Sequence, residues 1–153
     1  LRPRGPYPIL VFQGEQGTAK TTTARLLRRL VDPCKPLLRR PPDNDRDVAI
    51  AAWGNWIMGY DNLSGLPAKL SDALCCLSTG GGFGSRRLYT DEEEALFDAP
   101  RPVLLNGIDE IATRGDLASR AVIITLPKLE KVRPEDEFWA DFECARPSGT
   151  SRA

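Results

Sequence analysis

Eight consecutive residues near the start of the chain have the types and spacing of a phosphate-binding loop. They are Gly14, Glu15, Gln16, Gly17, Thr18, Ala19, Lys20 and Thr21. They match the pattern G-x-x-x-x-G-K-[ST] at every fixed position but one, where Ala19 replaces glycine. The alternative interpretation is a glycine turn followed by an ordinary helix cap. Alanine adds only one methyl group, so the departure is mild and we expect the loop to hold phosphate.

The chemistry of such a loop assigns a role to each part. Backbone N–H groups at a helix N-terminus converge on the phosphates, and the helix dipole adds positive potential. Lys20 is expected to neutralise the β and γ phosphates, and Thr21 to offer its hydroxyl to Mg²⁺. We therefore predict ATP and Mg²⁺ as cofactors, bound by the eight residues and by Thr22.

The elements around this loop fit an α/β protein. An apolar strand, YPILVF (7–12), precedes it, and apolar residues recur at helical spacing from 20 to 31 behind it. Further along, a short strand near Leu37, a helix capped by Asp45 and an amphipathic helix after Pro67 are expected. A brief helix is expected at 116–120, and further strands at 55–61, 102–106 and 121–127. This alternation predicts a three-layer P-loop NTPase core with a mainly parallel sheet flanked by helices.

A Mg·ATP site also needs a carboxylate at the end of a neighbouring strand. Asp61 closes the segment NWIMGYD and is the candidate metal ligand, together with Thr21. The alternative role for Asp61 is that of a turn residue, since Asp-Asn is also turn chemistry.

The phosphate loop resembles that of ring-forming ATPases of the AAA+ class. The resemblance implies that position 62 should be a glutamate that orients the attacking water, whereas this chain has Asn62. It also implies that Asn106 is a polar sensor of the γ phosphate, and that Arg120 is an arginine finger for the neighbouring subunit. The simpler alternatives are a turn residue for Asn106 and a helix-terminal cation for Arg120.

Over residues 7–127, the order of motifs is similar to the superfamily 3 helicase domain of phage and plasmid primase-helicases. That resemblance implies a DNA-contacting hairpin between the metal-binding strand and the Asn106 strand, with Arg86 and Arg87 facing single-stranded DNA. Alternatively these arginines are a solvated pair beside the acidic run Asp91 to Glu94. The resemblance further implies a homo-oligomeric ring in the full-length protein.

Three regions are expected along the chain. Residues 1–6 form a linker or remnant, 7–127 the ATPase core, and 128–153 a charged, irregular tail. The interval from Ser85 to Pro102 is expected to be an exposed hairpin or lid. Neither a helical lid domain nor a primase module fits in the remaining length, which suggests an excised or reduced ATPase core.

Composition narrows the possible function classes. The chain has 153 residues with 21 basic and 21 acidic side chains, so a wholly basic nucleic-acid-coating protein is excluded. It has no histidine, which excludes histidine chemistry. The four cysteines show no zinc-site spacing and are expected to be buried thiols. Without an apolar run of membrane-span or signal-peptide type, we expect a cytoplasmic protein with no membrane partner.

These observations favour one function and leave two alternatives. The favoured function is ATP binding and hydrolysis by the Mg·ATP-binding domain of a DNA helicase or primase-type replication protein of a phage or mobile element. Lys20, Asp61, Asn62, Asn106 and Arg120 are its candidate catalytic residues. The alternatives are a P-loop kinase of small molecules, and a weakly hydrolysing nucleotide-dependent scaffold or switch, for which Asn62 is the best evidence.

Overall fold

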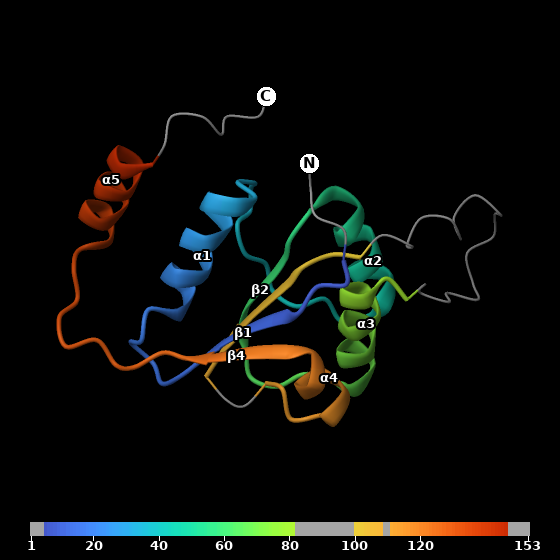
Figure 1. Cartoon of the computed structure of the whole chain (residues 1–153). Helices are drawn as coiled ribbons and strands as arrows, with labels where there is room; N and C mark the ends of the chain where they lie inside the picture. The colour runs from blue at the N-terminus through green and yellow to red at the C-terminus, as the bar shows by residue number, and fades with distance from the viewer. Residues whose placement is uncertain (1–4, 82–99, 109–110, 147–153) are drawn as a thin grey trace.

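The computed structural model describes residues 5–81, 100–108 and 111–146. Four parallel strands form its sheet, in the order β2-β3-β1-β4 (Figure 1). Their bounds are β1 (Ile9–Gln13), β2 (Met58–Leu63), β3 (Val103–Gly107) and β4 (Ala121–Thr125). Since all four strands are parallel, their carboxyl ends meet at one edge of the sheet.

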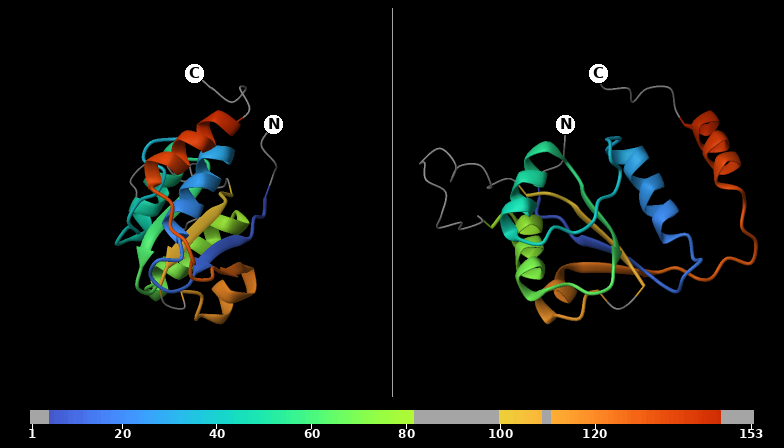
Figure 2. Two further views of the ribbon diagram at one scale, coloured as in Figure 1. Left: turned by 90° about the vertical axis from the view of Figure 1, so that its left-hand side faces the viewer. Right: turned by 180° about the vertical axis from the view of Figure 1, so that it is seen from behind.

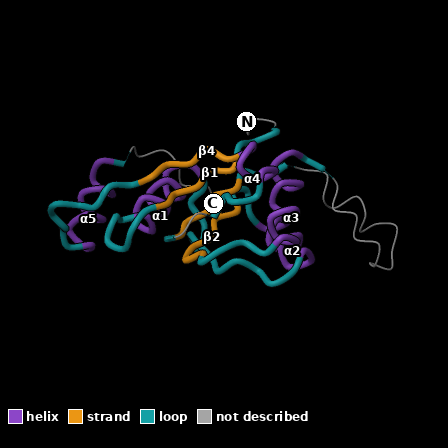
Figure 3. The backbone as a smooth tube through the Cα atoms, turned by 90° about the horizontal axis from the view of Figure 1, so that it is seen from below, coloured by secondary structure: helices purple, strands orange, loops and turns teal. Residues whose placement is uncertain are grey.

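Helices lie on both faces of this sheet. The helices are α1 (Lys20–Val31), α2 (Asp45–Gly54), α3 (Ala68–Thr79), α4 (Gly115–Arg120) and α5 (Glu135–Ala145), of which α5 lies beyond α1, away from the strands (Figure 1). Figures 2 and 3 show α1 on one side of the strands and α2 with α3 on the other. The expected three-layer α/β core is therefore confirmed.

Strand β1 is apolar on both faces because helices cover both faces at its position, whereas the residues of the edge strand β4 are intermediate or exposed. Ile9 and Val11 of β1 join the larger core cluster with side chains of α2 and α3, such as Leu74. Phe12 points to the opposite face and packs in a cluster that includes Ala24 of α1. The continuous apolar run that predicts a buried strand in the sequence is thus explained by the two-sided core.

Several expected boundaries shift by a few residues. Helix α2 begins at Asp45, but its cap is Asn44, whose side chain accepts a hydrogen bond from the backbone N–H of Asp47. Strand β2 starts at Met58, three residues later than expected, and extends beyond Asp61. The short strand expected near Leu37 is present as a parallel bridge between Arg39 and Tyr60 at the edge of the sheet.

The segment 128–153 is not irregular throughout, because α5 forms within it. None of the residues of α5 is buried. The helix contacts α1 through charged groups: Arg25 pairs with Glu135 at 3.3 Å, and Arg29 pairs with Glu143 at 2.8 Å. The Arg29 guanidinium also lies 4.2 Å from the centre of the Trp139 ring. Exposed pairs of this kind stabilise weakly. Because α5 is held by charged groups and buries no apolar face, the apolar pattern of the sequence does not reveal the helix.

Three further expectations concern burial and exposure. The four cysteines are free, but only Cys75 is buried, and Cys144 is exposed. The hairpin or lid expected from Ser85 to Pro102 lies, up to residue 99, outside the described residues. Among the described residues, no helix combines the length and the apolar character needed to cross a membrane.

Candidate functional site

The loop between β1 and α1 depends on two glycines with positive φ. Gly14 has a φ of +145°, and a Cβ atom there would lie 2.7 Å from the carbonyl oxygen of Leu126, just after β4. Gly17 has a φ of +85° in open space. A side chain at Gly14 would therefore collide with the backbone, and one at Gly17 would be strained by conformation alone. Both glycines are needed for the loop to turn.

The N-terminus of α1 is prepared for an anion. The first helical hydrogen bond is donated by the N–H of Thr23 to the carbonyl oxygen of Ala19, at 2.9 Å. The N–H groups of the three preceding helical residues, 20–22, have no acceptor within the helix. The first turn contains no acidic side chain that would neutralise this end. The positive end of the helix dipole is thus available to an external anion.

The Lys20 side chain folds back over the loop. Its Nζ donates hydrogen bonds to the carbonyl oxygens of Gly14 at 2.8 Å and Glu15 at 2.6 Å, and to the Thr18 hydroxyl at 3.3 Å. The Thr18 hydroxyl in turn donates to the Glu15 carbonyl at 3.0 Å. Lys20 and Thr18 are both buried. Among the described residues this buried ammonium is held by neutral oxygens and forms no ion pair, so an incoming anion would find a cation already in place.

Three polar side chains from three different elements meet beside this lysine. The Thr21 hydroxyl donates to Asp61 Oδ1 at 3.2 Å, and the Asn106 amide donates to the same oxygen at 2.6 Å. Asn106 also donates to the Thr21 hydroxyl at 3.2 Å. Thr21 lies in the first turn of α1, Asp61 in β2 and Asn106 in β3, so the structure brings together side chains that are 40 and 45 residues apart. Carboxylate and hydroxyl oxygens are the ligand types that Mg²⁺ prefers, so this donor set fits the metal.

Ala19 is less benign than its small side chain suggests. It has a φ of 57° and a ψ of 27°, which is the left-handed helical region. A residue with a Cβ atom pays roughly 1–2 kcal/mol in this conformation, whereas glycine does not. The departure from the motif therefore costs backbone strain rather than space.

Replacing this alanine should consequently stabilise the fold. We expect Ala19→Gly to raise the free energy of unfolding by about 1 kcal/mol, because relief of the left-handed strain exceeds the extra entropy of glycine in the unfolded chain. Urea unfolding followed by circular dichroism measures the change. As a control, Ala118→Gly in the helical conformation of α4 should destabilise by a similar amount. A loss of stability in Ala19→Gly would contradict the assigned strain.

Asn62 contributes its backbone rather than its side chain. It has a φ of 59°, a conformation that asparagine tolerates better than most residues, and its N–H donates to Asp61 Oδ1 at 2.8 Å. The pairing of β2 with β3 is irregular between Tyr60 and Leu63, so Asp61 and Asn62 lie in this irregular stretch. The Asn62 side chain is exposed and makes no hydrogen bond to the described residues. The expected catalytic position is thus near the site, but its amide is not part of it.

Arg120 lies at the other end of the sheet. It ends α4, and the next residue, Ala121, pairs with Ile9 at the start of β1, whereas the loop follows the end of that strand. Five residues of strand separate the two places by about 16 Å. The Arg120 guanidinium pairs with the carboxylate of Asp116. This hydrogen bond, together with a second one from Cys75, lowers the pKa of Asp116. Within one chain, Arg120 does not reach the site. Arg86 and Arg87 lie outside the described residues.

The family of the chain follows from its sequence as a whole. The model of the actinomycete integrative conjugative element replication protein matches residues 1–150. The chain belongs to this family. The match agrees with the expectation of a replication protein from a mobile element.

A comparison with solved structures finds a distant similarity. The chain is similar to the structure described as "The X-ray structure of Inhibitor Bound to JCV Helicase", with 14% sequence identity and a TM-score of 0.45. The similarity covers 83% of this chain and 37% of that chain, so this chain spans well under half of the length of the helicase chain. No curated protein matches the sequence.

One residue that helps to hold Asp61 is missed by sequence reasoning. The N–H of Asp61 donates to the carbonyl oxygen of Arg39 at 2.9 Å, and the N–H of Arg39 donates to Gly59 at 3.0 Å. Residue 39 thus fixes the outer side of β2 while β3 fixes the inner side. The apolar pair Leu37 and Leu38 is the sequence signal for this short strand, but it does not reveal which residue pairs with β2.

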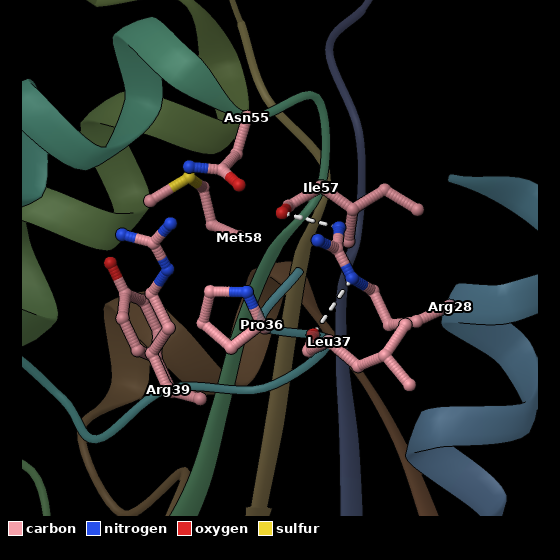
Figure 4. A pocket seen from close by; sticks show the side chains of 9 residues that line it. Arg28, Pro36, Leu37, Arg39, Asn55, Ile57 and Met58 are labelled. Atoms are coloured by element: carbon pink, nitrogen blue, oxygen red, sulfur yellow. Dashed lines mark hydrogen bonds between the residues drawn. The ribbon is translucent and has the colours of Figure 1, made fainter. Parts of the chain in front are cut away.

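A pocket lies beside β2 and is lined by Arg28, Arg39 and Tyr60 among others (Figure 4). Arg28 is buried, and it donates from Nε to the Leu37 carbonyl at 2.9 Å and from Nη1 to the Ile57 carbonyl at 2.5 Å. Its charge is balanced by Asp32 at 3.0 Å, which also accepts the N–H of Ile57. This network links the end of α1 to the start of β2. It therefore holds the two elements that carry Thr21 and Asp61 in a fixed position relative to each other.

The pocket itself contains one unpaired polar group. The Tyr60 hydroxyl is buried and has no hydrogen-bond partner among the described residues. Burial raises the pKa of Tyr60 to about 12, although the positive charge of Arg39 acts in the opposite direction. The phenol therefore stays neutral at physiological pH. It makes none of the hydrogen bonds that join Thr21, Asp61 and Asn106.

Proposed function

We propose that this protein binds ATP with Mg²⁺ and hydrolyses it during replication of its mobile element. The observation that carries the proposal is the meeting of Lys20, Thr21 and Asp61 where the phosphate loop enters α1. The strand β1 and the glycine turn precede Lys20 and Thr21, and these two residues begin the helix α1. This is the order that the phosphate-binding motif requires. A chance glycine turn would not need a buried lysine followed directly by a hydroxyl that is hydrogen-bonded to a carboxylate.

Each group has a defined task in this proposal. On nucleotide binding, Lys20 exchanges its hydrogen bonds with the neutral Gly14 and Glu15 carbonyls for bonds to anionic phosphate oxygens, which are stronger because donor and acceptor then carry opposite charges. The free N–H groups at the start of α1 donate to the same phosphates. Thr21 and Asp61 would hold Mg²⁺, which supplies charge neutralisation on the phosphates.

The role in replication extends the family membership. The family description names a replication protein, and the order of motifs resembles that of superfamily 3 helicases. We propose that ATP turnover drives movement on single-stranded DNA and that the active form is an oligomer. Arg120, which does not reach its own site, would then act on the nucleotide of a neighbouring subunit.

Nucleotide binding is tested first. Titration calorimetry with ATP should give tight binding in Mg²⁺ and at least tenfold weaker binding in EDTA. A measured affinity that does not change on chelation would remove Thr21 and Asp61 as metal ligands. A complete lack of ATP binding would overturn the whole proposal.

The proposed action on single-stranded DNA needs a separate experiment. In a sample shown to be oligomeric by light scattering, single-stranded DNA should raise the ATPase rate, and the effect should weaken with salt because phosphate contacts release counterions. A rate indifferent to DNA at low salt would contradict the helicase role and leave ATP binding intact.

A second candidate function is a slow nucleotide switch, which the conformation of Asn62 favours. A glutamate at this position would have to adopt a φ near 59°, where long side chains are rare. The backbone thus suits asparagine rather than a glutamate base. Rapid turnover by the unmodified protein would exclude this candidate.

A further inference from the structure

We infer that Asn106 is a positioning residue that orients the carboxylate of Asp61, rather than a sensor of the γ phosphate. This inference rests on the proposed function, because it assigns a part within the same Mg·nucleotide site. It differs from the role that the AAA+ resemblance implies for this position. The distinction is between an amide that acts on the metal ligands and an amide that acts on the last phosphate.

The Asn106 amide nitrogen donates to both candidate metal ligands. It lies 2.6 Å from Asp61 Oδ1 and 3.2 Å from the Thr21 hydroxyl. Asn106 is also 1% exposed, the least exposed of the three clustered side chains. Its amide is therefore engaged with the two residues that would hold the metal.

The three hydrogen bonds on Asp61 all fall on the same oxygen. Oδ1 accepts from the Asn106 amide at 2.6 Å, from the Asn62 N–H at 2.8 Å and from the Thr21 hydroxyl at 3.2 Å. In the described part of the chain, Oδ2 accepts no hydrogen bond from a neighbour. A carboxylate with one saturated oxygen cannot rotate without losing all three bonds. The arrangement thus fixes which oxygen is left for an external ligand.

Two different elements provide this orientation. The Asn62 N–H acts from the adjacent residue of β2, and the Asn106 amide acts from the neighbouring strand β3. Leucine at position 106 would have a similar volume but no donor, and alanine would leave a small space. In either variant the Asp61 carboxylate keeps the bonds from the Asn62 N–H and the Thr21 hydroxyl but loses the bond from β3, so it can tilt and its contribution to binding a metal should fall.

The two roles predict different nucleotide responses. The affinities of ADP and ATP would be measured by calorimetry with Mg²⁺ and with EDTA, for the unmodified full chain and for Asn106→Ala and Asn106→Leu. A positioning residue should lower the gain in affinity from Mg²⁺ at least tenfold for both nucleotides, because ADP also carries the metal. A γ-phosphate sensor should affect ATP alone. Affinities in EDTA should change little.

Controls keep these outcomes separate. Asn44→Ser replaces another asparagine by an equally good helix cap and should retain all four affinities. Thermal melting shows that each variant is folded. Because leucine fills a volume similar to that of asparagine, Asn106→Leu controls for any effect of the space that alanine leaves. Loss confined to ATP, or no loss in either folded variant, would overturn the inference. Failure of the unmodified protein to gain affinity from Mg²⁺ would instead overturn the metal part of the proposed function.

Discussion

Lys20→Ala is expected to reduce the affinity for Mg·ATP at least 100-fold, which corresponds to about 2.7 kcal/mol. The ammonium of Lys20 is the buried cation at the phosphate loop, held by the carbonyls of Gly14 and Glu15. Without it, these two carbonyl oxygens face the incoming phosphates with no positive charge between them. Titration calorimetry with ATP in Mg²⁺ measures the effect.

An exposed lysine provides the matched control for this experiment. Lys35 lies in the loop after α1 and is exposed, so Lys35→Ala removes the same charge from the chain without touching the loop. Its ATP affinity should equal that of the unmodified protein. Because Lys20 is buried, circular dichroism must show that Lys20→Ala is folded. An unchanged ATP affinity in the folded variant would show that the loop does not bind nucleotide through this lysine.

Gly107→Ala is expected to have the largest effect on stability, a loss of about 3 kcal/mol in the free energy of unfolding. Gly107 ends β3, where it pairs with Leu63 of β2. A Cβ atom there would overlap the backbone carbonyl oxygen of Leu63 and lie 2.7 Å from the side chain of Ile111. The backbone cannot move aside without separating β2 from β3. Urea unfolding measures the loss, and a thermal melt should show a decrease of roughly 10 °C.

The comparison for this variant is Gly115→Ala. A Cβ atom at Gly115 meets nothing within 4 Å, and the residue begins α4, so alanine should leave stability unchanged within about 0.5 kcal/mol or raise it slightly. Since Asn106 directly precedes Gly107, the Gly107 variant should also weaken Mg·ATP binding. Equal stability of the two alanine variants would contradict the close contact between β2 and β3.

Local patterns explain why much of the core could be predicted from the sequence. The helix from Lys20 to Val31 has the bounds that its spacing predicts, because a glycine loop begins it and Asp32 and Pro33 follow it. The apolar run of β1 predicts a buried strand and the β-branched run of β4 predicts a strand, and both strands are present, although β4 is largely exposed. Asp61 and Asn106 were predicted from their places near strand ends. Such signals depend on residues close together in the chain.

Other features depend on contacts that no local pattern contains. The α5 helix is not visible as an apolar stripe, because it is held to α1 by exposed ion pairs and a stacked arginine. The positive φ of Ala19 and of Asn62 follows from how the loop and β2 are fixed by their neighbours. The methyl group of Ala19 is small, but it strains the backbone because the fold holds this residue in the left-handed conformation.

The sequence by itself determined that the chain has a phosphate loop between a buried strand and an amphipathic helix, because these signals lie within about twenty consecutive residues. Only the tertiary structure decided that Asn106 donates to Asp61 and Thr21, and that Arg120 lies at the opposite end of the sheet. Parallel strands bring their carboxyl ends together whatever their separation in the chain. The pairing register, set by packing across the whole sheet, therefore decides which polar side chains meet.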